Sequence, residues 1–244
     1  MRLKAIVSYK GTNYFGFQIQ PKENEISIQG EIQKVLARIL SQDIKIYASG
    51  RTDRGVHALN QCFHFDLEKD SIDVYRLKHS MNCLLNDDIY IKSLEIVDSS
   101  FHARFSVVDK TYRYVINIGE YDPLNNELLF NLNKPLEVEI MKKASKLFLG
   151  SHSFHNFCCN DEDFIRTINS INIELKDQIL TIDINGDGFR RYMVRMIVGT
   201  LIEVGLNHIN EDKITYYLSE VNDKVNFKSP SCGLYLYQIN YGGQ

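Results

Sequence analysis

Residues 48–57 of the chain read Ala48-Ser49-Gly50-Arg51-Thr52-Asp53-Arg54-Gly55-Val56-His57. This stretch follows one strand-like run and precedes another, so we expect a loop at the edge of a sheet, where catalytic groups are common. Within it one carboxylate, Asp53, stands between Arg51 and Arg54, and two glycines allow the backbone to turn tightly. Nearby guanidinium groups favour the charged form of a carboxylate. Asp53 is therefore predicted to be ionised and able to act as a nucleophile.

The hydrophobic pattern on both sides of this loop predicts a mixture of strands and helices. Runs rich in Ile, Val, Tyr and Phe predict strands over residues 3–9, 44–48, 61–67, 90–97, 112–118, 168–175, 178–184 and 234–241. Apolar residues spaced by three and four predict helices over residues 28–39 (with Ser27 as N-cap), 74–85, 138–149, 190–204 and 214–221. The elements alternate without a strict βαβ rhythm, which indicates an α+β fold with mainly antiparallel sheets flanked by helices.

The order of elements divides the chain into two similar halves. A chain of 244 residues can hold two domains of about 120 residues each. We expect an N-terminal α+β half, residues 1–105, that carries the catalytic loop, and a C-terminal α+β half, residues 106–244. A cleft between the two halves is the expected ligand site.

Composition and charge narrow the class of protein. A formal charge of −3 gives no global sign of a nucleic-acid partner, but a basic cleft can still be local. No apolar run approaches the roughly 20 residues that a membrane span needs. The N-terminal sequence also lacks the apolar core and cleavage site of a signal peptide. We expect a cytoplasmic protein without a membrane partner.

The five cysteines are odd in number and lack paired spacing, which argues against a disulfide framework and suits a reducing compartment. His and Cys crowd together in residues 152–159, where a zinc site is one interpretation. The spacing matches none of the usual ligand patterns, however. Packing and hydrogen bonding under a loop is the alternative, and we expect no metal.

A resemblance to a known family rests on several motifs in collinear order. Residues 50–57 resemble the catalytic signature of the TruA family of tRNA pseudouridine synthases, G-R-T-D-x-G-V-H-A. Further segments resemble other parts of that family: Tyr9–Gln18, Phe101–Ser106, Lys110–Tyr114, Gly188–Gly199 and Gly233–Leu236. The similarity covers nearly the whole chain. It implies the pseudouridine synthase fold, and isomerisation of uridine to pseudouridine at positions 38, 39 and 40 of the tRNA anticodon stem-loop. It also implies a homodimer that holds tRNA across both subunits, with no cofactor.

The resemblance assigns roles to individual residues. Asp53 maps onto the nucleophile of the family, and Arg51 onto an arginine associated with base flipping and phosphate contact. Tyr112 maps onto an active-site tyrosine that stacks on the target base, whereas Tyr114 is expected to fill a core. Arg195 maps onto an arginine that pairs with the catalytic aspartate, so we expect Arg195 to reach Asp53.

Other basic residues are candidates for contacts with the RNA backbone: His57, His102, Arg104, Arg190 and Arg191. The sequence also departs from the family pattern at three positions. Arg54 stands where alanine is frequent, Phe17 replaces a tryptophan, and Asn86 replaces a proline. Because Arg54 adjoins the nucleophile, the departure there bears on RNA affinity and on the range of tRNAs accepted.

Two alternatives stay open at this point. One is a catalytically silent RNA-binding or RNA-chaperone protein of the same fold. The other is a glycosidase that acts on nucleosides, but glycosidases ordinarily need a second carboxylate and none stands out near Asp53. The route of the isomerisation is open too: attack on the uracil ring, attack on the ribose anomeric carbon, or a glycal-type elimination.

Overall fold

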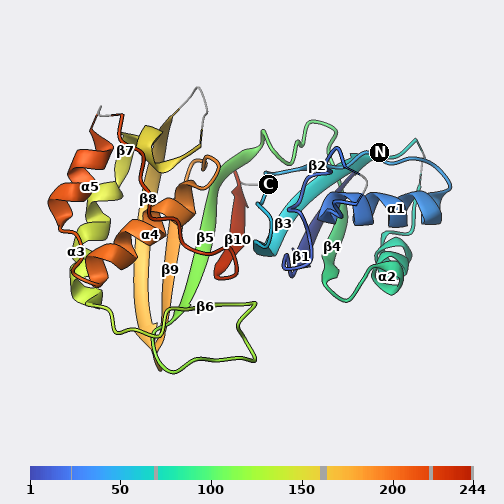
Figure 1. The fold of residues 1–244 in the computed structure, drawn as a ribbon. Coiled ribbons are helices and arrows are strands. Elements are labelled where there is room, and N and C mark those ends of the chain that lie inside the picture. Colours follow the sequence, from blue (N-terminus) through green and yellow to red (C-terminus); the bar gives the residue numbers. More distant parts are fainter. Residues whose placement is uncertain (23, 69–70, 160–163, 220–221, 243–244) are drawn as a thin grey trace. The chain divides into compact units, whose positions relative to one another are not determined.

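The structure, a computed structural model, describes residues 1–22, 24–68, 71–159, 164–219 and 222–242. The chain forms two compact units (Figure 1). The first unit holds residues 1–108 together with 236–244, and the second holds residues 109–235. Each unit carries mainly antiparallel strands flanked by helices, which confirms the predicted α+β class.

The sheet of the first unit is built around its N-terminal strand. β1 (Arg2–Tyr9) lies between β3 (His57–Asp66) and β4 (Ile89–Val97), antiparallel to both, and β2 (Tyr47–Ala48) pairs with β3. Side chains alternate along β1, so that every second residue is fully buried. Helices α1 (Ile28–Leu40) and α2 (Val74–Leu84) lie beside these strands in Figure 1. The Ser27 side chain caps α1 by accepting from the Gly30 amide, as predicted.

The sheet of the second unit has the order β5-β9-β8-β7. Its antiparallel strands are β5 (Val107–Asn117), β9 (Ile179–Gly186), β8 (Ile165–Lys176) and β7 (Gly150–Ser153), and β6 (Phe130–Asn131) runs parallel to β5. Helices α3 (Val138–Ser145), α4 (Met193–Gly205) and α5 (Glu211–Leu218) accompany it, with the short 3-10 turns η1 (Lys146–Phe148) and η2 (His155–Phe157). α4 is buried along most of its length, which makes it the central helix of this unit.

The last strand, β10 (Leu234–Tyr241), begins in the second unit and ends in the first. In the first unit, Asn60 Nδ2 donates to the Tyr237 carbonyl at 2.7 Å, and the Tyr241 hydroxyl donates to the Ala103 carbonyl at 2.8 Å. These bonds explain why residues 236–244, which the sequence analysis placed in the second half, pack with the first unit. The domain boundaries at 1–105 and 106–244 stay predictions.

Several predicted elements end differently in the structure. The expected strand 44–48 is reduced to β2, and the expected helix 138–149 ends at Ser145 and continues as η1. α4 begins at Met193 rather than at residue 190, because Tyr192 adopts a left-handed conformation with φ of 67°. α5 begins at Glu211 rather than at residue 214, with Asn210 as N-cap. The end of that expected helix, residues 220–221, lies outside the described residues. Within the described ranges, no helix is long and apolar enough to cross a bilayer.

Candidate active site

The first residues of the loop that carries Asp53 are held by a buried glutamine of β3. Gln61 Oε1 accepts from the Ser49 hydroxyl at 2.6 Å and from the Cys62 amide at 3.1 Å. Its Nε2 donates to the Gly50 carbonyl at 3.0 Å. Gln61 is fully buried, so these bonds form without competition from water. The first residues of the loop are therefore fixed to β3.

A second set of contacts holds the middle of the loop against residues 9–17. The buried Thr52 hydroxyl lies 2.8 Å from the Tyr9 hydroxyl, and the Thr52 carbonyl accepts from the Phe17 amide at 3.2 Å. Gly16 has φ of +92°, and a Cβ there would lie 2.5 Å from the Thr52 carbonyl oxygen. The backbone next to Asp53 is thus held by a segment that resembles the opening motif of the family.

The end of the loop is equally close to this segment. The Gly11 amide donates to His57 Nδ1 at 3.0 Å, and a Cβ on Gly11 would lie only 2.0 Å from the Val56 carbonyl oxygen. The Val56 amide in turn donates to the Asp53 carbonyl at 3.1 Å, and Gly55 has φ of 76°. The turn after Asp53 therefore needs glycine at both positions 11 and 55.

His57 lies differently from the expectation. Its side chain is 1% exposed and accepts the Gly11 amide, so it positions the loop instead of presenting a ring to RNA. This histidine was predicted to contact the RNA backbone because the sequence shows charge but not the direction of a side chain. His57 is the first residue of β3, where the strand enters the core.

The three charged residues of the loop are more accessible. Asp53 is half-buried, while Arg51 and Arg54 are exposed. The Arg54 guanidinium lies over the Phe15 ring, 4.3 Å from its centroid, in a cation–π contact. Arg54 is thus anchored to residues 9–17 as well, although alanine is frequent at this position in the family pattern.

Two residues expected beside Asp53 belong to the second unit. Tyr112 lies on β5 opposite Ile184 and packs edge-on against Phe189, with ring centroids 5.1 Å apart. Arg195 lies in the first turn of α4 and is half-buried, and its Nε donates to the Ser229 carbonyl at 2.7 Å. Because Asp53 lies in the first unit, its contacts with Tyr112 and Arg195 stay predictions.

Tyr114 is a core residue, as predicted. It is fully buried, and its hydroxyl donates to the Pro230 carbonyl at 2.7 Å. Burial raises the pKa of this hydroxyl well above its usual value, so it remains a neutral hydrogen-bond donor. Tyr114 therefore orients the segment before β10.

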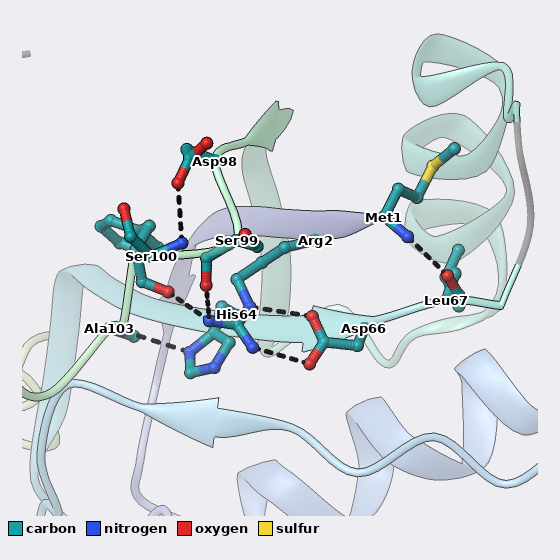
Figure 2. A network of polar contacts seen from close by, with 10 residues as sticks. Met1, Arg2, His64, Asp66, Leu67, Asp98, Ser99, Ser100 and Ala103 are labelled. Atoms are coloured by element: carbon teal, nitrogen blue, oxygen red, sulfur yellow. Dashed lines mark hydrogen bonds and ion pairs between the residues drawn. The ribbon is translucent and has the colours of Figure 1, made fainter.

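The segment Phe101–Ser106 is anchored by a polar network around Arg2, the first residue of β1 (Figure 2). Arg2 forms a bidentate ion pair with Asp66 at 2.8 Å, and its Nη1 donates to the carbonyls of Ser99 and Phe101. The hydrogen bond from Arg2 lowers the pKa of the Asp66 carboxyl below its usual value. The network fixes the stretch of chain that leads into β5, on which Tyr112 lies.

His64 is the buried ring of this network. Its Nδ1 accepts from the Ala103 amide at 3.2 Å, and its ring stacks on Tyr47 with centroids 5.1 Å apart. Burial and the positive charge of Arg2 lower its pKa to about 4. The neutral ring is therefore the form that fits the folded chain.

We expect His64 to make the protein acid-sensitive. Between pH 6.5 and about 4 the unfolded chain binds a proton at His64 that the folded chain does not, so the free energy of unfolding falls as pH falls through this range. We expect a loss of about 1–3 kcal/mol, measured by urea unfolding at several pH values. His64→Asn keeps an acceptor for the Ala103 amide and should reduce the pH dependence. The same change at the exposed His79 is the control, and an equal slope in both variants would contradict this assignment.

The other candidate RNA contacts differ in exposure. Arg104 and Arg191 are exposed, and Arg190 is half-buried. His102 is half-buried and uses Nδ1 to accept the amides of Arg104 and Phe105 at 3.1 and 3.4 Å. RNA contacts by these arginines stay predictions, whereas the His102 ring is held in its own turn by the two amides.

Residues 152–159 form no metal site in the part of the chain that the structure describes. His152 Nε2 lies 2.8 Å from the Leu149 carbonyl, and His155 Nε2 lies 3.1 Å from Asn222 Oδ1. The Cys158 thiol donates to the His155 carbonyl at 3.7 Å. The contacts match the alternative of packing and hydrogen bonding. Residue 160, next to this cluster, lies outside the description.

Residues 48–57 and the residues that hold them, 9–17 and Gln61 (the clamp), fall within a sequence match to a known family. A family model described as tRNA pseudouridine synthase matches residues 5–106 and 144–242. The chain belongs to the tRNA pseudouridine synthase family. This confirms the resemblance found in the sequence.

Curated relatives in this family match along almost their whole length. A tRNA pseudouridine synthase A of Exiguobacterium is 40% identical over 245 residues, covering 98% of this chain and 98% of that protein. Proteins of the same name from Geobacillus and Mycoplasma genitalium are 39% and 38% identical, again covering 98% of this chain and 98% of each relative. The similarity is therefore not confined to the signature but extends over nearly the whole of each relative.

Sequence reasoning found the charged residues of the synthase loop but missed the groups that hold it. Gln61, Thr52 and Tyr9 are buried polar side chains whose hydrogen bonds decide where Asp53 lies. The sequence does not reveal them, because residues 57–66 mix polar and apolar side chains and the pattern does not show which polar group is buried.

Proposed function

We propose that this chain isomerises uridine to pseudouridine in tRNA, with Asp53 as the nucleophile. One observation carries the proposal: the family signature stands on a loop whose backbone is held on both sides of Asp53 by buried hydrogen bonds. A nucleophile must be held within a fraction of an ångström of its target to be effective. The clamp supplies that rigidity while Asp53 itself stays half-buried and accessible.

The reaction itself sets what the site must do. The N1–C1′ bond breaks, the uracil ring rotates, and a C5–C1′ bond forms, while C5 loses a proton and N1 gains one. The change is redox-neutral and is completed within one nucleotide. The uridine must leave the base stack to be reached, which requires an enclosing pocket and a group that replaces its stacking neighbour.

Each remaining site residue has a place in this scheme. Tyr112 would stack on the displaced uracil, since a phenol ring offers a face to any base. Arg195 would pair with Asp53 and hold it ionised. Arg51, which is exposed, would contact the RNA and assist base flipping, and Arg54 would influence which tRNAs are accepted. His57 would act indirectly, through Gly11 and the loop.

The anticodon stem-loop at positions 38, 39 and 40 is the proposed target, and the cytoplasm, where tRNA is abundant, is the proposed location. Residues 50–57 and Lys110–Tyr114 both resemble segments of the family, which supports the same target as in the resemblance. The experiment incubates the full chain with unmodified tRNAs and maps pseudouridine at nucleotide resolution. Product in the anticodon arm is expected. RNA binding without product on any tRNA would instead favour the catalytically silent protein.

A homodimer is the proposed working form. Two subunits would join two local basic surfaces into a longer track, which a chain of net charge −3 needs in order to hold a polyanion. Light scattering is expected to give twice the chain mass of 28.3 kDa. A mass equal to one chain, both without and with tRNA, would refute the dimer but would not bear on the proposed isomerisation.

A further inference from the structure

Three cations surround one tyrosine ring in the second unit. The centroid of the Tyr192 ring lies 4.4 Å from Lys228 Nζ, 4.8 Å from the Arg191 guanidinium carbon and 5.5 Å from that of Arg195. Arg191 Nη2 also donates to the Tyr192 hydroxyl at 2.9 Å. We call these four residues the Tyr192 cluster. It gathers three positive charges and no negative one.

The fold places Lys228 in this cluster through its neighbour Ser229. The Ser229 amide and hydroxyl both donate to the Arg195 carbonyl, at 3.1 and 3.0 Å, and Arg195 Nε donates back to the Ser229 carbonyl at 2.7 Å. A Cβ on Gly199 would lie 2.2 Å from the Phe227 carbonyl oxygen, so this segment runs directly against α4. The backbone on both sides of Lys228 is therefore fixed to the helix that carries Arg195.

The charges of Lys228 and Arg195 are only partly compensated by their contacts with the ring. A cation–π contact at an exposed site is only weakly stabilising, while cations held a few ångströms apart repel one another. Across the described ranges, neither Lys228 nor Arg195 forms an ion pair with a carboxylate. Lys228 and Arg191 are exposed, so the cluster presents its charge to solvent. An anion bound here would remove the repulsion.

We propose that the Tyr192 cluster binds one backbone phosphate of the RNA substrate, an inference that rests on the proposed function. A phosphodiester brings one negative charge and oxygens that accept from ammonium, guanidinium and phenol groups. Arg195 belongs both to this cluster and to the proposed pair with Asp53. The phosphate held here therefore belongs to the target uridine or to a nucleotide next to it.

Salt dependence of RNA binding tests the site. The full chain is titrated with a synthetic anticodon stem-loop at several KCl concentrations, and the logarithm of affinity is plotted against the logarithm of salt. Losing one phosphate contact should reduce the slope by about 0.7–0.9. We expect this change, with several-fold weaker binding, for Lys228→Ala, and recovery of the wild-type slope for Lys228→Arg.

Lys176→Ala is the matched control. It removes the same charge from an exposed residue at the turn of the β8–β9 hairpin, where Lys176 pairs with Ile179. We expect its affinity and slope to equal those of the wild type. A slope for Lys228→Ala equal to that of Lys176→Ala would overturn the proposal.

Replacing single phosphodiesters of the RNA by uncharged linkages identifies which phosphate the cluster binds. Stem-loops are made with a single methylphosphonate at each linkage around the target uridine, and each is bound to wild type and to Lys228→Ala. One linkage should weaken wild-type binding but leave Lys228→Ala unaffected, since both changes remove the same contact. Additive effects of Lys228→Ala and the neutral linkage at every position would overturn the proposal. So would a Lys228→Ala variant that binds RNA normally but binds polyglutamate more weakly, a result that would indicate an acidic protein partner.

The outcomes separate this inference from the proposed function. A wild-type chain that makes pseudouridine, with Lys228→Ala binding RNA normally, refutes the phosphate site and leaves the isomerase intact. A wild-type chain that shows the linkage-specific effect but makes no pseudouridine on any tRNA refutes the isomerase and supports an RNA-phosphate site in a silent binding protein.

Discussion

Replacing Asp53 by alanine is expected to abolish pseudouridine formation, lowering kcat by on the order of 10⁴-fold or more. Alanine removes the carboxylate, and the other charged residues of the loop, Arg51 and Arg54, offer no nucleophile. The loop itself should persist, because Thr52, Gly16, Gly11 and His57 hold its backbone. The measurement is single-turnover conversion of uridine in a tRNA transcript.

The affinity of the Asp53→Ala variant for the same tRNA shows whether the variant has lost only the reaction or also its folded structure. Removing a negative charge does not weaken binding of a polyanion, so we expect the Asp53→Ala variant to bind at least as well as the wild type. Asp43→Ala, which removes an exposed carboxylate before β2, is the control and should keep full activity. Activity of Asp53→Ala within tenfold of the wild type would exclude Asp53 as the nucleophile.

Gly11→Ala is expected to have the second large effect, although residue 11 carries no chemistry. The added methyl group would lie 2.0 Å from the Val56 carbonyl oxygen, a backbone atom that cannot turn away. The loop must then move, and overpacking of this kind costs about 1–3 kcal/mol of stability. A displacement near 1 Å at a reacting group lowers the rate on the order of 10²-fold. Denaturant unfolding and single-turnover kinetics measure the two effects.

Gly242→Ala provides the comparison for this variant. A Cβ at residue 242 would meet the Val108 side chain at 3.4 Å, an ordinary contact. We therefore expect little change in stability or rate. Equal behaviour of the Gly11 and Gly242 variants would show that the contact between residues 11 and 56 does not position Asp53.

The regular elements could be predicted from local pattern. β10 spans residues 234–241 as expected, and α1 begins after Ser27 because its apolar stripe and its N-cap agree. α4 could not be placed correctly from pattern alone, since Arg190 and Arg191 read as good helix formers. A tyrosine at φ of 67° ends the irregular segment before that helix, and no sequence rule expects a ring-bearing residue there.

The sequence predicts which residue of the site is reactive, but not the contacts that position it. The signature identifies Asp53, but the orientation of His57 depends on Gly11, 46 residues earlier in the chain. Long-range contacts of this kind leave no trace in a single sequence. The Tyr192 cluster also depends on a long-range contact. Lys228 lies over the ring because the backbone of residue 227 packs against Gly199.

The path of β10 has a consequence for synthesis on the ribosome. Strands β1, β3 and β4 emerge early, yet residues 236–244 of the same compact unit emerge only after the whole second unit has been translated. Until then the Ala103 carbonyl lacks the hydroxyl of Tyr241, and Cys62 and Phe101 lack the cover of Ile239 and Tyr241. The unit that carries Asp53 therefore cannot complete its packing around Cys62 and Phe101 until Tyr241 has been translated.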